Sequence, residues 1–248
     1  MSSHARTRAE FVAAWYSFVR RRTAVFFTFF FPVILIVIFG ALVTTDPTGG
    51  GLFTEPPEYY LPGYLAVVVL FTPLSRVGST VARHREGNRF EKLATTPLSR
   101  TEWLLAHTLV NAILVGIASA ILIGVLWLLT DATFSLSPLL VPFIGVGTAV
   151  FCGIGAILGR VADSQDGVIA AANTIALPML FLAETFVPPT LLPGWMGPVI
   201  DLLPLTYFSR GVREATVSGG PWLADLAVLA GLALVFFVAG AYALPRTD

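Results

Sequence analysis

The sequence predicts an all-α integral membrane protein with six transmembrane helices, and three observations support this fold class. Hydrophobic residues make up 56% of the 248 residues and charged residues only 12%, about half the charged share of a soluble domain. Six apolar stretches reach the length of about 20 residues that a membrane-crossing helix needs. Basic residues flank these stretches asymmetrically, as the positive-inside rule requires.

The whole chain, residues 1–248, is expected to form one transmembrane domain. Its spans are predicted at residues 24–45, 61–82, 103–130, 136–159, 168–187 and 222–244. Lipid demands that backbone hydrogen bonds be satisfied internally, and no strand alternation recurs, so helices are expected. The first stretch is longer than the apolar part of a signal peptide and lacks a small-residue cleavage site, so it is interpreted as a retained span.

Charge predicts the orientation. Twelve of the fifteen Lys and Arg residues fall on one side of a six-span topology, whereas only Arg210 and Arg213 fall on the other and Arg76 lies inside the second span. Both termini are therefore expected in the cytoplasm. The excess of arginine, fourteen to one lysine, is typical of a GC-rich prokaryotic genome, so the plasma (inner) membrane of a prokaryote is the expected location.

Two segments outside the spans are also expected to be helical. Residues 1–22 carry an apolar stripe at helical spacing, from Phe11 to Val19, and predict an amphipathic helix in the membrane interface. That helix is either a simple anchor or an elbow that also touches a cytoplasmic partner. Residues 188–221 are apolar but interrupted by prolines, and predict short outer re-entrant or interfacial helices between spans five and six.

Small residues mark places where helix backbones can approach closely. Gly116, Ala120 and Gly124 recur at four-residue spacing in the third span, and Gly155 and Gly159 form a GxxxG pair in the fourth. Packing within one subunit and a seam between two subunits both remain open.

Motifs for catalysis are absent from the sequence. There is no phosphate-binding loop, no G-x-S-x-G, no H-E-x-x-H, and no set of Cys and His at metal spacing. The chain is therefore not expected to be an enzyme by itself, nor to bind a cofactor or metal. Asp163 and Asp166 are the only candidate catalytic pair, and they are also explained as the start of span five, where Asp complements the helix dipole.

The loop at residues 83–102 is the most informative stretch. Charges of both signs surround Phe90 and Leu93, which lie three residues apart on one helix face. Pro97 is expected to end this helix, and Ser99 with Glu102 resembles a capping box that opens span three. The segment is either a solvated basic loop or a short cytoplasmic helix with an apolar contact face and a charged rim.

This stretch resembles the intracellular loop of the permeases of type-2 ABC exporters, whose pattern is R-E-x-G-T-L-E-x-L-x-x-T-P-L-S-R-x-E. The sequence departs from the pattern at Asn88, Arg89 and Phe90 and matches it at Arg85, Glu86, Gly87, Glu91, Leu93, Thr96, Pro97, Leu98, Ser99, Arg100 and Glu102. Further pieces in the same order extend the resemblance over nearly the whole chain: Phe31-Pro32, Phe39-Gly40, Leu61-Pro62-Gly63, Pro188, Leu192-Pro193-Gly194-Trp195, Leu203-Pro204-Leu205-Thr206-Tyr207 and Arg213.

The resemblance implies a transmembrane permease subunit that moves a substrate out of the cell by alternating access. It implies two protein partners: a second permease subunit, with a homodimer favoured over a heterodimer, and a separate ABC ATPase that holds ATP and Mg. Membrane lipid is an expected partner and nucleic acid is not. The residues expected to couple to the ATPase are Arg85, Glu86, Arg89, Phe90, Glu91, Leu93, Thr96 and Pro97.

The candidate residues for a substrate path or exit gate are Arg76, Glu184, Trp195, Tyr207 and Arg213. Arg76 either snorkels to the cytoplasmic interface or lines a central path. Glu184 either pairs with Arg210 or Arg213, or faces the exit path. Few spans carry charge, which favours a hydrophobic or amphipathic cargo. A membrane-embedded lipid-modifying enzyme and a non-transporting membrane anchor for an ATPase remain the alternative functions.

Overall fold

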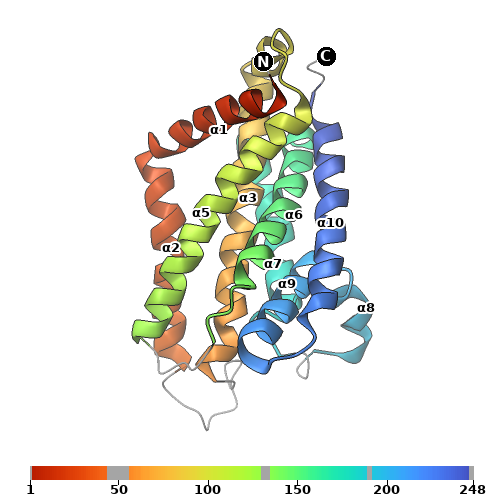
Figure 1. The fold of residues 1–248 in the computed structure, drawn as a ribbon. Helices are drawn as coiled ribbons and strands as arrows, with labels where there is room; N and C mark the ends of the chain where they lie inside the picture. Colours follow the sequence, from red (N-terminus) through yellow and green to blue (C-terminus); the bar gives the residue numbers. More distant parts are fainter. Residues whose placement is uncertain (1, 44–55, 130–134, 189–191, 246–248) are drawn as a thin grey trace.

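The computed structural model describes residues 2–43, 56–129, 135–188 and 192–245, and these residues form helices and turns without a strand. The helices are α1 (Ser3–Val19), α2 (Arg22–Val43), η1 (Pro57–Tyr60), α3 (Leu61–Glu86), α4 (Arg89–Ala94), α5 (Arg100–Leu129), α6 (Leu140–Val161), α7 (Gln165–Leu182), η3 (Gly194–Met196), α8 (Gly197–Ile200), α9 (Pro204–Arg213), η4 (Glu214–Ser218) and α10 (Trp222–Ala243). Figure 1 shows long helices running side by side, with both termini at the same end.

Five helices are long and apolar enough to cross a membrane: α3 with η1, α5, α6, α7 and α10. Among the described residues the count rises to six if α1 and the first part of α2, which meet at an angle of 84°, are counted as one bent pair. Five of the six predicted spans therefore coincide with described helices that have the length and composition of a membrane span. The first predicted span, 24–45, corresponds to α2, and its last two residues lie outside the described part of the chain.

The observed helix ends differ from the expected span boundaries by a few residues, and two of these differences bear on the site. The helix of span two continues to Glu86, so residues 83–86 belong to α3 and not to the loop. The helix of span five ends at Leu182 and not at 187, because Glu184 adopts a left-handed backbone conformation with φ 55° that a helix cannot contain.

α3 is the centre of the bundle. Residues 61–70 are buried throughout, and α3 packs against α6, α7 and α5. A Cβ atom at Gly155 would come within 2.7 Å of the Leu74 carbonyl oxygen, and one at Gly159 within 2.4 Å of the Gly78 carbonyl oxygen. The GxxxG pair therefore packs α6 on α3 within one subunit. A Cβ atom at Gly116 or Gly124 of α5 would meet no other atom within 4 Å, so these two glycines do not pack a helix within the described part of the subunit.

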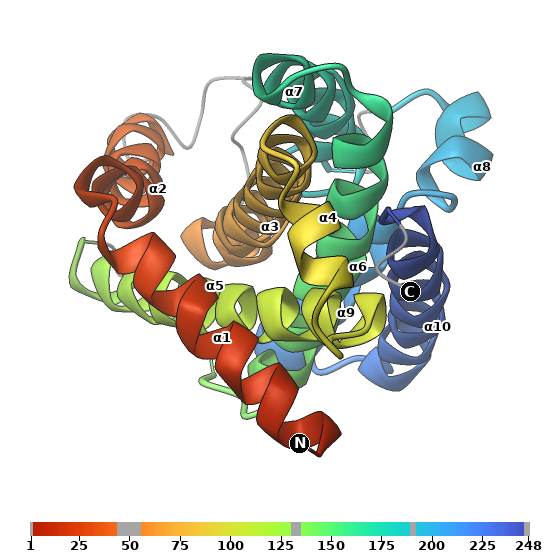
Figure 2. The same cartoon turned by 90° about the horizontal axis from the view of Figure 1, so that it is seen from above.

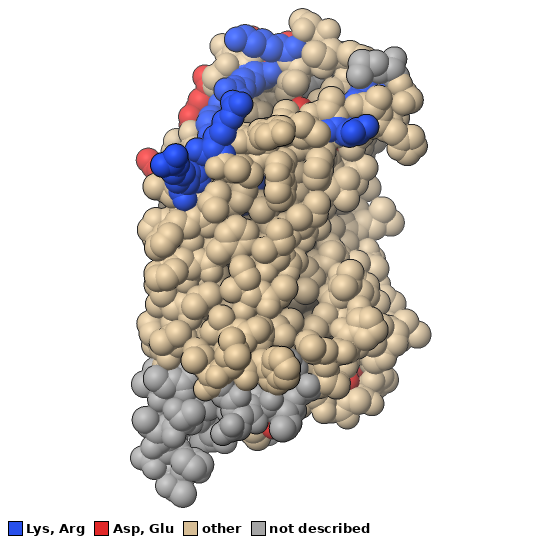
Figure 3. Space-filling model, turned by 60° about the vertical axis from the view of Figure 1, so that its left-hand side comes forward, with Lys and Arg blue, Asp and Glu red and all other residues tan. Residues whose placement is uncertain are grey.

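The two ends of the bundle differ in charge. Figure 3 shows the Lys and Arg side chains gathered at one end; this end, formed by α1, α4 and the turn between α6 and α7, is called the basic end below. α1 lies across it and packs Phe18 and Ala14 against Val110 and Leu114 of α5. Val12 and Val19 of the predicted apolar stripe are exposed, whereas Phe18 is buried, so only part of the stripe packs on protein.

The opposite end carries the short helices expected at residues 188–221. η3, α8, α9 and η4 follow one another there, and α9 packs against α10, α3 and α6. Leu205, Phe208 and Val212 of α9 are fully buried, which explains why this proline-interrupted segment is so apolar.

Candidate functional site

α4 is attached to the bundle through Phe90. The chain leaves α3 through a turn in which Asn88 has φ 50°, and α4 then begins at Arg89. The Phe90 ring packs against the rings of His84 and Trp103, with centroid separations of 5.5 Å and 5.6 Å. Phe90 is 4% exposed, so it anchors the helix between α3 and α5. This corrects the expectation of an outward apolar contact face, because residue spacing defines a face without its direction.

The outward surface of α4 is charged. Arg89, Glu91 and Lys92 are exposed, and Leu93 is half-buried beside the Phe90 cluster. The helix ends where Thr95 and Thr96 donate their hydroxyls to the carbonyls of Lys92 and Leu93, at 2.8 Å and 2.7 Å. Thr96 and Pro97, which follow the helix, are exposed as well. The exposed surface of α4 is therefore a short rim that carries both positive and negative side chains.

Arg85 and Glu86 connect the end of α3 to the turn between α6 and α7. Arg85 Nη1 donates to the carbonyl oxygens of Gly159 and Ala162, at 3.1 Å and 2.9 Å. Glu86 Oε1 accepts from the backbone N–H of Gln165 at 3.2 Å. Both side chains therefore hold the frame that carries α4. The sequence does not indicate these contacts, because the elements that Arg85 and Glu86 join are distant in sequence.

The start of the next span is capped as predicted. The Ser99 N–H donates to Glu102 Oε2 at 2.9 Å, and the Glu102 N–H donates to Ser99 Oγ at 3.2 Å, which is a capping box.

Glu102 also receives Arg6 from α1, with Nη2 to Oε1 at 2.6 Å and Nε to Oε2 at 3.0 Å. This hydrogen bonding raises the pKa of Arg6 above its ordinary value. One carboxylate thus connects α1, the loop and α5.

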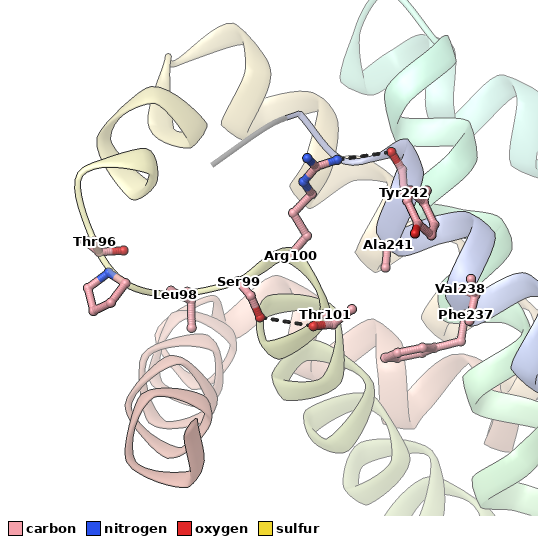
Figure 4. A pocket seen from close by; sticks show the side chains of 10 residues that line it. Thr96, Leu98, Ser99, Arg100, Thr101, Phe237, Val238, Ala241 and Tyr242 are labelled. Atoms are coloured by element: carbon pink, nitrogen blue, oxygen red, sulfur yellow. Dashed lines mark hydrogen bonds between the residues drawn. The ribbon is translucent and has the colours of Figure 1, made fainter. Parts of the chain in front are cut away.

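A pocket of about 600 Å³ lies between the end of the loop and α10. Figure 4 shows its lining, with Arg100 reaching across to the C-terminal helix. Arg100 Nη1 donates to the carbonyls of Leu244 and Tyr242, at 3.2 Å and 3.5 Å. The walls are formed by residues 96–101 on one side and by Phe237, Val238, Ala241 and Tyr242 on the other. The T-P-L-S-R stretch therefore borders a recess at the basic end.

Arg76 lines a second, larger cavity at the basic end. This cavity has a volume of about 810 Å³ and lies between α1, α3, α4, α5 and α7. The Arg76 guanidinium stands 4.2 Å above the centre of the Phe18 ring of α1. Five other polar or basic side chains of α3 line it with Arg76, at helical spacing: Ser75, Ser79, Thr80, Arg83 and His84. The sequence shows this polar spacing, but Arg83 and His84 fall in the predicted loop at residues 83–102, whereas in the structure they belong to α3.

The remaining candidate residues lie at the opposite end. Glu184 is 5% exposed and accepts two hydrogen bonds from Arg210, Nη2 to Oε1 at 2.5 Å and Nε to Oε2 at 3.0 Å. The pairing with Arg210 confirms one of the two alternatives for Glu184. Arg210 also forms an ion pair with Asp201 at 3.0 Å. Hydrogen bonding to Glu184 raises the pKa of Arg210 further above its ordinary value.

Three more of the predicted gate residues surround this cluster or lie near it in sequence. Arg213 donates to the Glu184 carbonyl at 2.5 Å and its guanidinium stands 4.2 Å above the Tyr59 ring. Tyr207 donates its hydroxyl to the Asp201 carbonyl at 2.6 Å. Trp195, in η3, is 74% exposed. The candidate path residues therefore divide between the two ends, with Arg76 alone at the basic end.

Within the part of the chain that the structure describes, no three side chains of His, Cys, Asp and Glu are grouped so that they could hold a metal ion. The other candidate pair, Asp163 and Asp166, lies at the start of α7. There Ser164 is the cap, its Oγ accepting from the Gly167 N–H at 3.1 Å, and Asp166 occupies the first turn.

Comparisons with known proteins show the family of the chain. Residues 6–217 match the model of the ABC-2 type transporter family. The chain is also 28% identical, over 199 residues, to the daunorubicin resistance ABC transporter permease protein DrrB1 of Streptomyces coeruleorubidus; the match covers 75% of this chain and 69% of that protein. The chain thus belongs to the ABC-2 type transporter family and is the transmembrane component of an ABC transporter.

Proposed function

We propose that the chain exports a substrate across the plasma membrane of a prokaryote, as a homodimer driven by a separate ABC ATPase that binds ATP and Mg. In this proposal the basic end and both termini lie in the cytoplasm, in keeping with the positive-inside rule. The sixth span is formed by α2, while α1 lies in the interface. The name of the relative ties that protein to daunorubicin resistance, which favours outward transport.

The observation that carries the proposal is the position of α4. Its charged rim is exposed, whereas Phe90 is buried between His84 of α3 and Trp103 of α5. A displacement of α4 by a docked ATPase therefore acts on two long helices at once, because a buried ring in a packed core cannot move without its neighbours. Alternation between inward- and outward-facing states follows if the ATPase binds them with different affinity.

α1 is proposed to take part in the same movement. Arg6 and Glu102 join α1 to the first turn of α5, beside the loop that carries α4. This contact favours the elbow role over the simple anchor, since α1 would follow any rotation of the start of α5.

The docking step is tested with Glu91→Arg, which reverses a charge on the exposed rim. The permease is purified with its cognate ATPase and reconstituted in vesicles, and ATPase retention and permease-dependent ATP hydrolysis are measured. We expect a loss of about ten-fold or more in stimulated hydrolysis, because the reversed charge would face a surface of like charge on the ATPase, which costs several kcal/mol. Stability should change by less than about 0.5 kcal/mol, as is usual for surface positions.

The matched control is Arg160→Glu, an exposed charge reversal at the end of α6 outside the loop. It should leave ATPase retention unchanged. Equal effects of Glu91→Arg and Arg160→Glu would refute docking at α4. Phe90→Ala separates transmission from docking, since it should keep ATPase binding but uncouple hydrolysis from transport.

A further inference from the structure

The cavity around Arg76 is unusual in its charge. Five cations from different elements line it: Arg21 between α1 and α2, Arg76 and Arg83 on α3, and Arg89 and Lys92 on α4. The one carboxylate in its described lining is Glu10, whose Oε1 lies 3.2 Å from His107 Nε2. Figure 2 looks onto this end of the molecule and shows α4 beside the end of α3, with α1 on one side of the two and α7 on the other.

These cations lack anionic partners within the described residues. The ion pairs found there join Arg6 to Glu102, His107 to Glu10, and Arg210 to Glu184 and Asp201. Arg76 Nε is buried and has no hydrogen-bond partner among those residues. Arg83 Nη2 reaches only Thr80 Oγ1, at 3.3 Å on the same helix. Arg76 and Arg83 are partly buried, whereas Arg21, Arg89 and Lys92 are exposed. Like charges at partly buried positions destabilise one another unless an anion joins them.

The cations lie at different distances from the basic end. Arg89 and Lys92 stand on α4, while Arg76 lies ten residues before the last residue of α3, which is about 15 Å along the helix at 1.5 Å per residue. Arg76 and Arg83 are seven residues apart and so lie on one face of α3. Hydroxyl donors at Ser75, Ser79 and Thr80 line the same face.

Apolar side chains complete the walls. Phe18 and Ala14 of α1, Ala24 of α2 and Ile169 of α7 border the same cavity. A ligand that fills it therefore needs an anionic group for the arginines and an apolar part for these side chains. Phosphate and carboxylate are the groups that arginine binds most strongly.

We propose that this cavity binds the anionic headgroup of an amphiphile from the adjacent membrane leaflet, with the headgroup held by Arg76 and Arg83. The inference concerns binding alone and stands whether or not the chain exports cargo. Anionic lipid headgroups and free phosphate share the required chemistry, and the apolar wall favours the lipid.

The test measures binding to the purified full-length permease in detergent, without an ATPase. Native mass spectrometry is used to titrate dioctanoyl-phosphatidylglycerol, dioctanoyl-phosphatidylcholine with the same chains, and glycerol phosphate as the headgroup alone. We expect phosphatidylglycerol to bind about ten-fold or more tightly than phosphatidylcholine, a difference of about 1.4 kcal/mol. Both lipids carry a phosphate, but the choline cation of phosphatidylcholine is repelled by the cations that line the cavity. Added salt should narrow the difference.

Variants locate the site. Arg76→Gln and Arg83→Gln should each weaken phosphatidylglycerol binding by about ten-fold, and Arg76→Lys should retain much of the preference. Arg160→Gln removes an exposed arginine outside the cavity and should change nothing. Arg83 lies nearer the end of α3, so its variant reports on the site even if Arg76→Gln disturbs folding.

Three results would overturn the proposal. Equal binding of the two lipids would exclude headgroup recognition. Equal losses in Arg83→Gln and Arg160→Gln would place the binding elsewhere. If glycerol phosphate bound as tightly as phosphatidylglycerol, the acyl chains would contribute nothing, and the cavity would be a site for free anions and not for an amphiphile.

Discussion

The two ends of the molecule use charge differently. At the opposite end, Arg210 forms ion pairs with both Glu184 and Asp201 around the segment that joins α7 to α9. At the basic end, the Glu102–Arg6 pair holds α1 to α5 in the same way, but five further cations surround a cavity without a carboxylate partner among the described residues. Ion pairs with a buried carboxylate hold chain segments together, whereas cations without a carboxylate partner can bind an anionic ligand.

The largest effect of breaking a pair is expected at Glu184. Glu184→Gln leaves the backbone conformation unchanged but removes the charge that Arg210 contacts. We expect a loss of about 2–3 kcal/mol in unfolding free energy, at the low end for a buried pair because Arg210 is 34% exposed. Membrane insertion should persist while transport falls.

A double variant checks the cause of this loss. Glu184→Gln combined with Arg210→Gln should be no less stable than Glu184→Gln alone, because the uncompensated charge has gone. A double variant that adds the losses of the two single variants would show that the pair is not a unit.

A smaller effect is expected at Glu102. Glu102→Gln weakens both the capping box and the bond to Arg6, and should cost about 1–2 kcal/mol. Hydrogen exchange should rise over residues 3–19, since α1 loses its attachment. Ser99→Ala removes only the capping hydroxyl and should leave exchange in α1 at the wild-type level; equal exchange in the two variants would contradict the role of Arg6.

The smallest effect is expected at Asp201. Its side chain is 57% exposed, so Asp201→Asn should change the unfolding free energy by no more than about 0.5 kcal/mol, and less at high salt. Chemical denaturation at two salt concentrations measures this. A loss as large as that of Glu184→Gln would show that burial does not decide the strength of these pairs.

Local signals in the sequence predicted local features correctly. The capping box of Ser99 and Glu102, the end of α4 before Pro97 and the short helices after Pro188 all depend on neighbouring residues, whose preferences are fixed by backbone geometry. The apolar stretches likewise gave the long helices to within a few residues, since lipid allows little else.

Contacts between distant residues could not be predicted. Arg6 meets Glu102 across 96 positions, and Arg85 reaches Gly159 across 74. The inward orientation of the Phe90 side chain depends on how α3 and α5 are placed relative to α4, and the spacing of residues in the sequence does not define this placement. The early end of α7 follows from a left-handed residue that the sequence does not mark, since Glu184 is neither Gly nor Asn.

The most direct test of the contrast between paired and unpaired charge is the thermal unfolding midpoint of Arg83→Gln beside that of Glu184→Gln, measured on purified permease in one detergent. The account predicts that Arg83→Gln unfolds at the wild-type temperature or slightly above it, because one repulsive charge is gone. Glu184→Gln should unfold about 5–10 °C lower. An Arg83→Gln protein that loses as much as Glu184→Gln would show that the cavity cations are structural, and would contradict the account.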